Sequence, residues 1–221
     1  MKKVLTVLAL SVLLISLSSN SSQAQFRLRV GPQVGLNFNI QSGSDVTETT
    51  NGFGALIGAQ VDMNFTPVIG LMANMQFYDN RYASYSVDGT AGATPYTETV
   101  GFSMAYFMIE PLFKVTVPNS NFFFFIGPSL GFPVQSSWED KLSSSGNSVT
   151  FQSDGATKHT GTIRNTNARF EMKLGSGVDI NLGGVILAPQ FSFGYGLSNI
   201  EENDEAKILT FQLLSTVKFP L

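Results

Sequence analysis

Hydrophobic and polar residues alternate along most of the chain with a period of two, which is the spacing of side chains on a β-strand. In residues 27–40 every even position is apolar, whereas the odd positions carry Arg, Gly, Gln and Asn. Similar runs cover residues 52–65, 69–77, 98–117, 122–132, 169–181, 185–197 and 208–221. A tilted strand crosses a bilayer with about ten residues, close to the length of most of these runs. The pattern therefore predicts eight strands, each with one apolar face.

Residues 98–117 form the run in which the apolar pattern leaves the two faces ambiguous. Met104, Tyr106 and Met108 alternate there with residues that are equally apolar. We orient this run by Glu110 and Lys114, because a lysine in contact with lipid near the bilayer centre costs about 2–4 kcal/mol. The even positions of the run are therefore predicted to face inward.

Charged residues fall on the inward face of every predicted strand that carries them. Ten charged residues lie on this face. Eight of them are on strands that were oriented by their apolar residues alone, and only Glu110 and Lys114 were themselves used to orient a strand. Six cations and four carboxylates in a narrow interior can mostly pair with one another. Arg27 and Arg29 are placed to reach either the last strand across the closing seam or Asp62 on the second strand. The predicted charge network in the lumen consists of Arg27, Arg29, Asp62, Glu110, Lys114, Arg169, Glu171, Lys173, Asp179 and Lys218.

The connections between the strands alternate between long and short. Segments 39–51, 79–97, 135–167 and 198–207 are long and polar, whereas the turns near 64–67, 117–121 and 181–184 are short. Long loops on one rim and short turns on the other are typical of outer-membrane barrels of Gram-negative bacteria. We therefore expect an all-β fold, an eight-stranded antiparallel transmembrane up-and-down β-barrel, in the cell outer membrane with both termini on the periplasmic side.

The first 24 residues have the composition of a secretory signal peptide. Lys2 and Lys3 precede an apolar stretch from Val4 to Leu17, and Ser22 and Ala24 occupy the small-residue positions of a cleavage site. We expect residues 1–24 to be a cleaved signal peptide and residues 25–221 to form the barrel domain.

Composition narrows the class of protein further. Hydrophobic residues make up 43% of the chain and charged residues only 13%, which indicates that part of the surface is not covered by water. The absence of cysteine excludes a disulfide scaffold, a thiolate metal site and a lipidated cysteine. A formal net charge of -3 argues against nucleic acid as a partner.

Two sequence patterns suggest chemistry, and neither is accepted as a site. Residues 127–131 match the G-x-S-x-G nucleophile motif, with Asp154 and His159 following in the hydrolase order. This motif requires a strand, a sharp turn and a helix, but the pentapeptide lies inside an alternating run. The acidic segment 201–205 offers oxygen ligands for calcium, but a solvated acidic loop explains it better. We expect no enzyme activity, no catalytic residues, no cofactor and no metal.

The order of short motifs resembles the PorT-like family of small outer-membrane β-barrels of Bacteroidota. The resemblance covers essentially residues 26–221 and rests on the order and spacing of the motifs. They are VGPQVGLNFN after the signal segment, IEPLFKV, FFFFIGPSLGF, KLGSGVDI, FGYGLSNI and a final strand that contains VKF. The resemblance implies a small outer-membrane barrel and identifies no ligand.

The expected function is that of a structural or interaction protein with a side-chain-filled lumen that acts through its long extracellular loops. The alternatives are a porin-like pore for small solutes and a soluble periplasmic carrier of the lipocalin type. An eight-stranded interior is only wide enough to be filled by side chains, which favours the first function. The expected partners are outer-membrane lipid, the outer-membrane insertion machinery and a surface or envelope protein that contacts the loops.

Overall fold

The computed structural model describes residues 26–221 apart from residues 44–49, 146–147, 165 and 200–205. The predicted signal peptide and the acidic segment 201–205 therefore lie outside the described residues. The strands are β1 (Arg27–Gly43), β2 (Thr50–Asn64), β3 (Ile69–Ala91), β4 (Thr94–Thr116), β5 (Phe122–Ser143), β6 (Lys158–Thr162), β7 (Arg169–Val178), β8 (Ile180–Asn181), β9 (Ile186–Gly196) and β10 (Ala206–Pro220).

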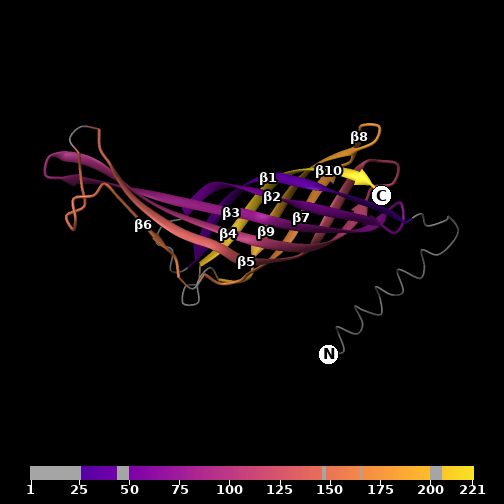
Figure 1. The fold of residues 1–221 in the computed structure, drawn as a ribbon, viewed down its shortest axis with the longest axis horizontal. Helices are drawn as coiled ribbons and strands as arrows, with labels where there is room; N and C mark the ends of the chain where they lie inside the picture. The colour runs from indigo at the N-terminus through magenta and orange to yellow at the C-terminus, as the bar shows by residue number, and fades with distance from the viewer. Residues whose placement is uncertain (1–25, 44–49, 146–147, 165, 200–205) are drawn as a thin grey trace, which may run out of the picture.

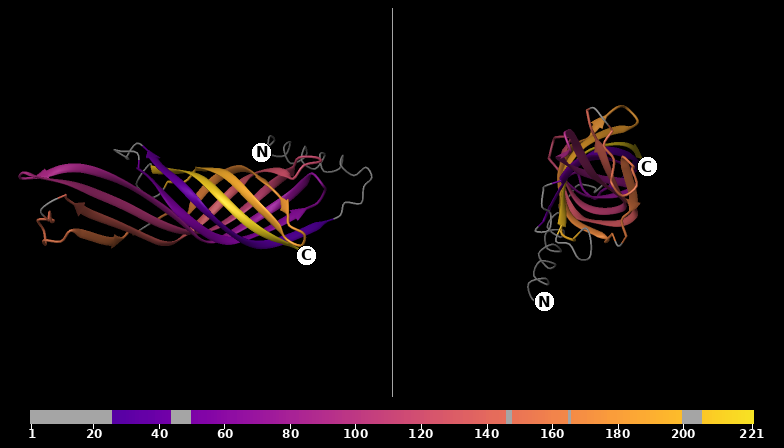
Figure 2. Two further views of the ribbon diagram at one scale, coloured as in Figure 1. Left: turned by 90° about the horizontal axis from the view of Figure 1, so that it is seen from above. Right: turned by 90° about the vertical axis from the view of Figure 1, so that its left-hand side faces the viewer.

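Eight of these strands form a closed antiparallel ring. The order around the ring is β1, β2, β3, β4, β5, β7, β9 and β10, and β10 pairs with β1 to close it. The short strands β6 and β8 pair with β5 and β9 outside this order. The end-on view in Figure 2 shows the strands surrounding one axis. The prediction of an eight-stranded up-and-down barrel is confirmed, and the closure leaves no strand edge unpaired in lipid.

The apolar parity faces outward and the polar parity faces the lumen. On β1, the polar residues Gln33, Asn37 and Asn39 are at most 1% exposed. The apolar residues between them, such as Val34 and Leu36, are more than half exposed. Such an interior would offer no apolar cavity to a lipid ligand, so the alternative of a lipocalin-like carrier is wrong. Large apolar side chains that are at least 47% exposed include Val34, Leu36, Phe53, Ile57, Phe113, Phe122, Phe124, Ile126, Leu174, Phe191 and Leu213.

Inward-facing glycines on β7 make room for two phenylalanines of β5. A Cβ atom on Gly175 would lie 2.4 Å from Cζ of Phe125, and one on Gly177 would lie 2.5 Å from Cζ of Phe123. These distances are far below van der Waals contact, so a larger residue at either glycine would displace an aromatic ring. The small inward residues of β7 therefore allow aromatic side chains to fill the lumen.

The predicted long loop at 79–97 is wrong, because β3 and β4 continue through most of it. The two strands stay paired as far as Ala91 and Thr94, and Gly92 has a φ of 65° in the connecting turn. The predicted loop at 135–167 is also partly strand, since β5 continues to Ser143 and pairs with β6. Strands outside the membrane need no apolar face, so they lack the alternation on which the prediction relied.

The extended strands form a sheet that projects beyond one end of the ring. We call residues 85–91 of β3, 94–100 of β4, 137–143 of β5 and 158–162 of β6 the projecting sheet (Figure 1, left). The opposite end of the barrel carries short turns at residues 65–68, 117–121 and 182–185, and we call it the short-turn rim. The C-terminus lies at this rim, where the backbone N–H of Leu221 donates to the carbonyl of Leu28.

A β-bulge on β3 reverses the parity of this strand halfway along. The register shifts between Gln76 and Asp79 on β3, and Phe77 and Tyr78 are 53% and 40% exposed. Two consecutive residues thus face outward, after which the odd positions face the lumen instead of the even ones. The bulge turns Asp79 and Arg81 into the barrel.

Candidate functional site

Six buried charges, which we call the deep cluster, lie inside the lumen. The guanidinium of Arg169 donates to Glu171 with an Nη2–Oε2 distance of 2.6 Å. Arg81 pairs with Asp79, and its Nη2 is 3.8 Å from Oε1 of Glu171. No member of the cluster is more than 5% exposed, so each charge depends on the others for stabilisation. The members are Asp79, Arg81, Glu110, Arg169, Glu171 and Lys173.

Polar side chains complete the hydrogen bonding around Glu110 and Lys173 in the deep cluster. Lys173 forms an ion pair with Glu110, and it also donates to the amide oxygen of Gln212 over 2.7 Å. Asn74 and Ser129 donate to the two carboxylate oxygens of Glu110 over 2.8 and 3.0 Å. The deep cluster contains three cations and three carboxylates, so it is electrically neutral.

Five charges near the short-turn rim form a second group, which we call the mouth cluster. Lys114 and Lys218 both donate from Nζ to Oδ2 of Asp62 over 2.7 Å. Asp179 accepts from Lys218 and from Arg29, each over 2.9 Å. The side chains of Arg29 and Asp179 are 16% exposed, whereas those of the other three members are at most 1% exposed.

An apolar layer lies between the two clusters on the side of β3, β4 and β5, whereas Gln60, Gln190 and Thr216 form hydrogen bonds with one another on the opposite side. Inward positions on β4 carry Lys114 of the mouth cluster, then Leu112, then Glu110 of the deep cluster. The ring of Phe123 lies beneath the mouth cluster, with its centroid 4.4 Å from Nζ of Lys114 and 4.9 Å from Nζ of Lys218. The layer consists of Met72, Leu112, Phe123 and Phe125, which are at most 3% exposed.

A second apolar layer lies beyond the deep cluster, toward the projecting sheet. The next inward side chains of β4 are Met108, Tyr106 and Met104, and they pack with Ile208 of β10. Ile163 packs against this group from the connection that follows β6. Charged and apolar layers therefore alternate along the barrel axis and fill the lumen with side chains.

The structure brings nine of the ten predicted lumen charges into the two clusters. The tenth, Arg27, is an exposed residue at the short-turn rim. Of the two partners that were open for Arg29, the last strand and Asp62, the structure shows neither: Arg29 pairs with Asp179, and two lysines occupy Asp62. Asp79 and Arg81 were not predicted to face the lumen, because the bulge that turns them inward leaves no parity signal.

The residues of the hydrolase-like motif do not come together as a catalytic group. Ser129 is a buried residue of β5 whose hydroxyl donates to Glu110 and not to His159. His159 lies on the projecting sheet, where its Nε2 is 3.0 Å from Oδ2 of Asp154. Hydrogen bonds from the backbone N–H of Ala156 and from His159 lower the pKa of Asp154. His159 and Asp154 thus stabilise the local loop.

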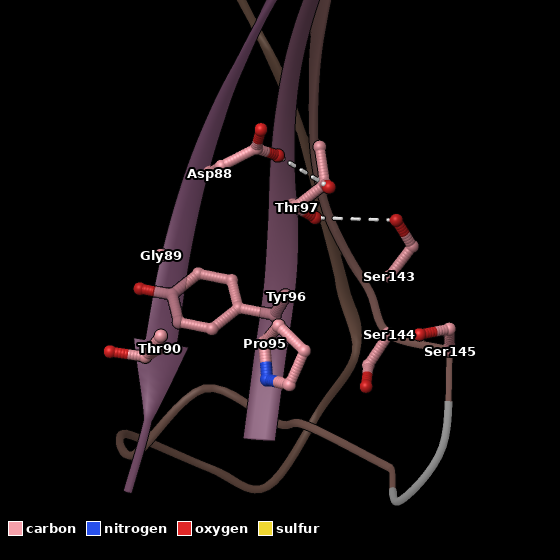
Figure 3. A pocket seen from close by; sticks show the side chains of 9 residues that line it. All are labelled: Asp88, Gly89, Thr90, Pro95, Tyr96, Thr97, Ser143, Ser144 and Ser145. Carbon is pink, nitrogen blue, oxygen red and sulfur yellow. Dashed lines mark hydrogen bonds between the residues drawn. The ribbon is translucent and has the colours of Figure 1, made fainter. Parts of the chain in front are cut away.

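An open pocket of about 880 Å³ lies at the far end of the projecting sheet (Figure 3). Thr97 donates to Oδ1 of Asp88 over 2.7 Å, and Ser143 donates to the carbonyl of Thr97 over 3.3 Å. The ring of Tyr96 packs over Gly89, where a Cβ atom would lie 2.6 Å from Cζ of Tyr96. Hydroxyl groups and one aromatic face therefore dominate this pocket, which is lined by Asp88, Gly89, Thr90, Pro95, Tyr96, Thr97, Ser143, Ser144 and Ser145.

Among the described residues, no group of three or more His, Asp or Glu side chains is arranged to hold a metal ion. Within the same part of the chain, no helical segment has the length and hydrophobicity that crossing a membrane requires.

A closed ring with an apolar outer face and a polar, filled interior defines an integral outer-membrane barrel. Residues 23–202 match the model of the family described as outer membrane protein beta-barrel domain, and the chain belongs to this family. The protein is therefore an outer-membrane protein.

Comparison with known proteins gives no match among the curated sequences. Among solved structures, the chain is similar to Ail, the attachment invasion locus protein of Yersinia pestis, with 13% identity, a TM-score of 0.39 and coverage of 86% of this chain and 98% of that one. It is also similar to Neisserial surface protein A, with 13% identity, a TM-score of 0.37 and coverage of 87% and 96%. For OprG from Pseudomonas aeruginosa the values are 8% identity, a TM-score of 0.38 and coverage of 89% and 95%.

Proposed function

We propose that this protein is a closed outer-membrane barrel that acts as an interaction protein through its projecting sheet, and that it is neither a pore nor an enzyme. The filled lumen is the observation that carries the proposal. The side chains of the apolar layer around Phe123 and of the neutral deep cluster are all at most 5% exposed, which supports a lumen filled by side chains. The only histidine lies outside the lumen and contacts Asp154, which supports a role without catalysis.

The projecting sheet provides the contact surface in this proposal. With the termini on the periplasmic side, the sheet extends from the cell surface. Its terminal pocket presents Tyr96, Asp88 and several hydroxyl groups, which suit a polar partner such as a surface or envelope protein. Lipid surrounds the apolar outer face, the insertion machinery assembles the barrel, and nucleic acid is not a partner.

We further propose membership of the PorT-like branch of small barrels from Bacteroidota. The motifs of this branch coincide with the strands that build the lumen, since IEPLFKV contains Glu110 and Lys114 and KLGSGVDI contains Lys173 and Asp179. A search of complete Bacteroidota genomes that finds these four charges at aligned positions would support this assignment. Genomes that show the four charges varying independently would contradict it.

The filled lumen predicts that the purified protein conducts little or no current in planar bilayers. Buried ion pairs and aromatic side chains occupy the path that ions would take, and separating them is energetically expensive. Single-channel recording alongside an open porin should show at most small, infrequent current steps. A large and stable conductance would favour the pore function instead.

Contact through the terminal pocket is tested by photo-crosslinking on whole cells. A benzoylphenylalanine in place of Tyr96 is expected to form a discrete adduct with a protein, because this side chain lines the pocket. The same residue in place of Val34, which is 54% exposed on the barrel wall, should react with lipid only. Lipid adducts alone at both positions would contradict the proposed interaction surface.

A further inference from the structure

A polar pocket of about 340 Å³ opens at the short-turn rim, at the opposite end of the barrel from the projecting sheet. Arg27, Arg29, Lys114 and Asp179 line it, and the turns contribute Thr66 and Asn121. Its volume is at the lower end of the range for small-molecule sites, about 300–1,000 Å³. The pocket is therefore large enough for a small organic solute.

Among the side chains that the structure describes, the mouth cluster contains one more cation than carboxylates. Arg29, Lys114 and Lys218 share only the two carboxylates of Asp62 and Asp179. The deep cluster, by contrast, matches three cations with three carboxylates. Burial makes an excess charge costly unless an opposite charge approaches it. The excess of one positive charge lies beside the pocket, and Arg27 at the same rim adds to the positive potential there.

The carboxylates of the mouth cluster are already shared between several cations. Asp62 accepts from two lysines through Oδ2, and Asp179 lies within 3.5 Å of Lys114 in addition to its bonds with Arg29 and Lys218. Arg29 contacts Asp179 through Nη1, and a guanidinium carries five N–H donors in a planar fork. This fork can contact an oxyanion in the pocket while Asp179 stays in place.

None of the residues that line the pocket belongs to the apolar layer or to the deep cluster. The ring of Phe123, which is fully buried, lies 4.4 Å from Nζ of Lys114 and 4.9 Å from Nζ of Lys218. An anion attracted to the rim would therefore stop at the mouth cluster instead of passing through the barrel. Because Arg29 and Lys114 face the barrel axis, the ligand approaches from the aqueous side of the rim.

We propose that the pocket at the short-turn rim binds a small soluble organic phosphate. Arg29 and Arg27 offer planar N–H donors that match the oxygens of a phosphate, and Lys114 supplies a further positive charge. The bound phosphate neutralises the excess charge of the mouth cluster. The site is independent of the projecting sheet and of any partner that binds there.

Calorimetric titration of the full-length folded protein tests this site, with glycerol 3-phosphate as the probe and glycerol as its uncharged control. The protein is held in phosphatidylcholine nanodiscs at constant ionic strength. Saturable binding of glycerol 3-phosphate and none of glycerol is expected. Arg29→Gln should weaken binding by about tenfold, which is the loss of about 1.4 kcal/mol. Arg27→Gln changes a second cation of the same pocket, at an exposed position.

Asp179→Asn is expected to change the affinity for glycerol 3-phosphate in the opposite direction. Removing this carboxylate increases the excess positive charge beside the pocket, so the affinity for glycerol 3-phosphate should rise. Lys207→Gln, near the opposite end of β10, should leave the affinity unchanged. A general loss of folding would weaken binding in every variant, so opposite effects of Arg29→Gln and Asp179→Asn identify the site.

Three results would overturn the proposal. The first is the absence of saturable phosphate binding, and the second is an equal response of the Arg29→Gln and Lys207→Gln variants. The third concerns the source of the phosphate and uses nanodiscs that contain phosphatidylglycerol. If phosphatidylglycerol in the nanodisc prevents glycerol 3-phosphate from binding, and this effect requires Arg29 and Arg27, then the site binds the phosphate of a lipid headgroup and not a soluble ligand.

Discussion

Glu171→Gln is expected to lower the free energy of unfolding by about 3–5 kcal/mol. Glu171 is fully buried, accepts from Arg169 over 2.6 Å and lies within 3.9 Å of Arg81 and Lys173. Glutamine has nearly the same shape, so the substitution removes the charge and leaves the three cations with two carboxylates. Denaturant titration of folding into lipid vesicles measures the loss.

Glu139→Gln is the matched control for this prediction. Glu139 also forms an ion pair, with Lys158 over 2.8 Å, but the two side chains are 45% and 50% exposed on the projecting sheet. Water screens such a pair, so the loss should stay below about 1 kcal/mol. Similar losses of unfolding free energy for Glu171→Gln and Glu139→Gln would show that the deep cluster stabilises the barrel no more than an exposed ion pair does.

Val34→Arg is expected to make folding into bilayers less favourable by about 2–4 kcal/mol. Val34 lies in the middle of β1, and 54% of its side chain is exposed on the outer face. An arginine at this position places its guanidinium in lipid, whereas the valine has no polar group to hydrate. Folding efficiency and denaturant midpoints in vesicles both report this cost.

Val87→Arg makes the same chemical change outside the membrane. Val87 is 47% exposed and pairs with Glu98 within the projecting sheet, where water surrounds the new charge. The free energy of folding should change by less than about 1 kcal/mol. A large effect of Val87→Arg, or a negligible effect of Val34→Arg, would mean that the lipid-facing surface has been assigned incorrectly.

The strands of the ring and the two faces of each could be predicted because lipid imposes a strict alternation on a transmembrane strand. Even the ambiguous strand β4 follows this rule: Glu110 and Lys114 are buried as expected, together with Met104, Tyr106 and Met108. The inward position of Phe123 and Phe125 also agrees with their parity. A charge on the wrong face would cost more than local preferences could offset, which makes the pattern readable without a structure.

The projecting sheet could not be predicted in the same way. Residues 85–97 contain Tyr, Thr and Val, which favour strands, but both faces of the segment contact water and carry polar residues. Polarity alone therefore indicated a loop. Pairing of β3 with β4 as far as Ala91 and Thr94 depends on the register that the membrane-spanning parts of these strands impose.

The amino-acid sequence by itself determined the barrel class, the number of strands in the ring and nine of the charges that the lumen contains. Only the tertiary structure decided which of these charges pair. Partners such as Arg29 and Asp179 lie 150 positions apart and meet through the curvature of the closed ring, which no local pattern records. The bulge at Phe77 and Tyr78 likewise added Asp79 and Arg81 to the lumen, because one extra outward residue reverses every side chain that follows it.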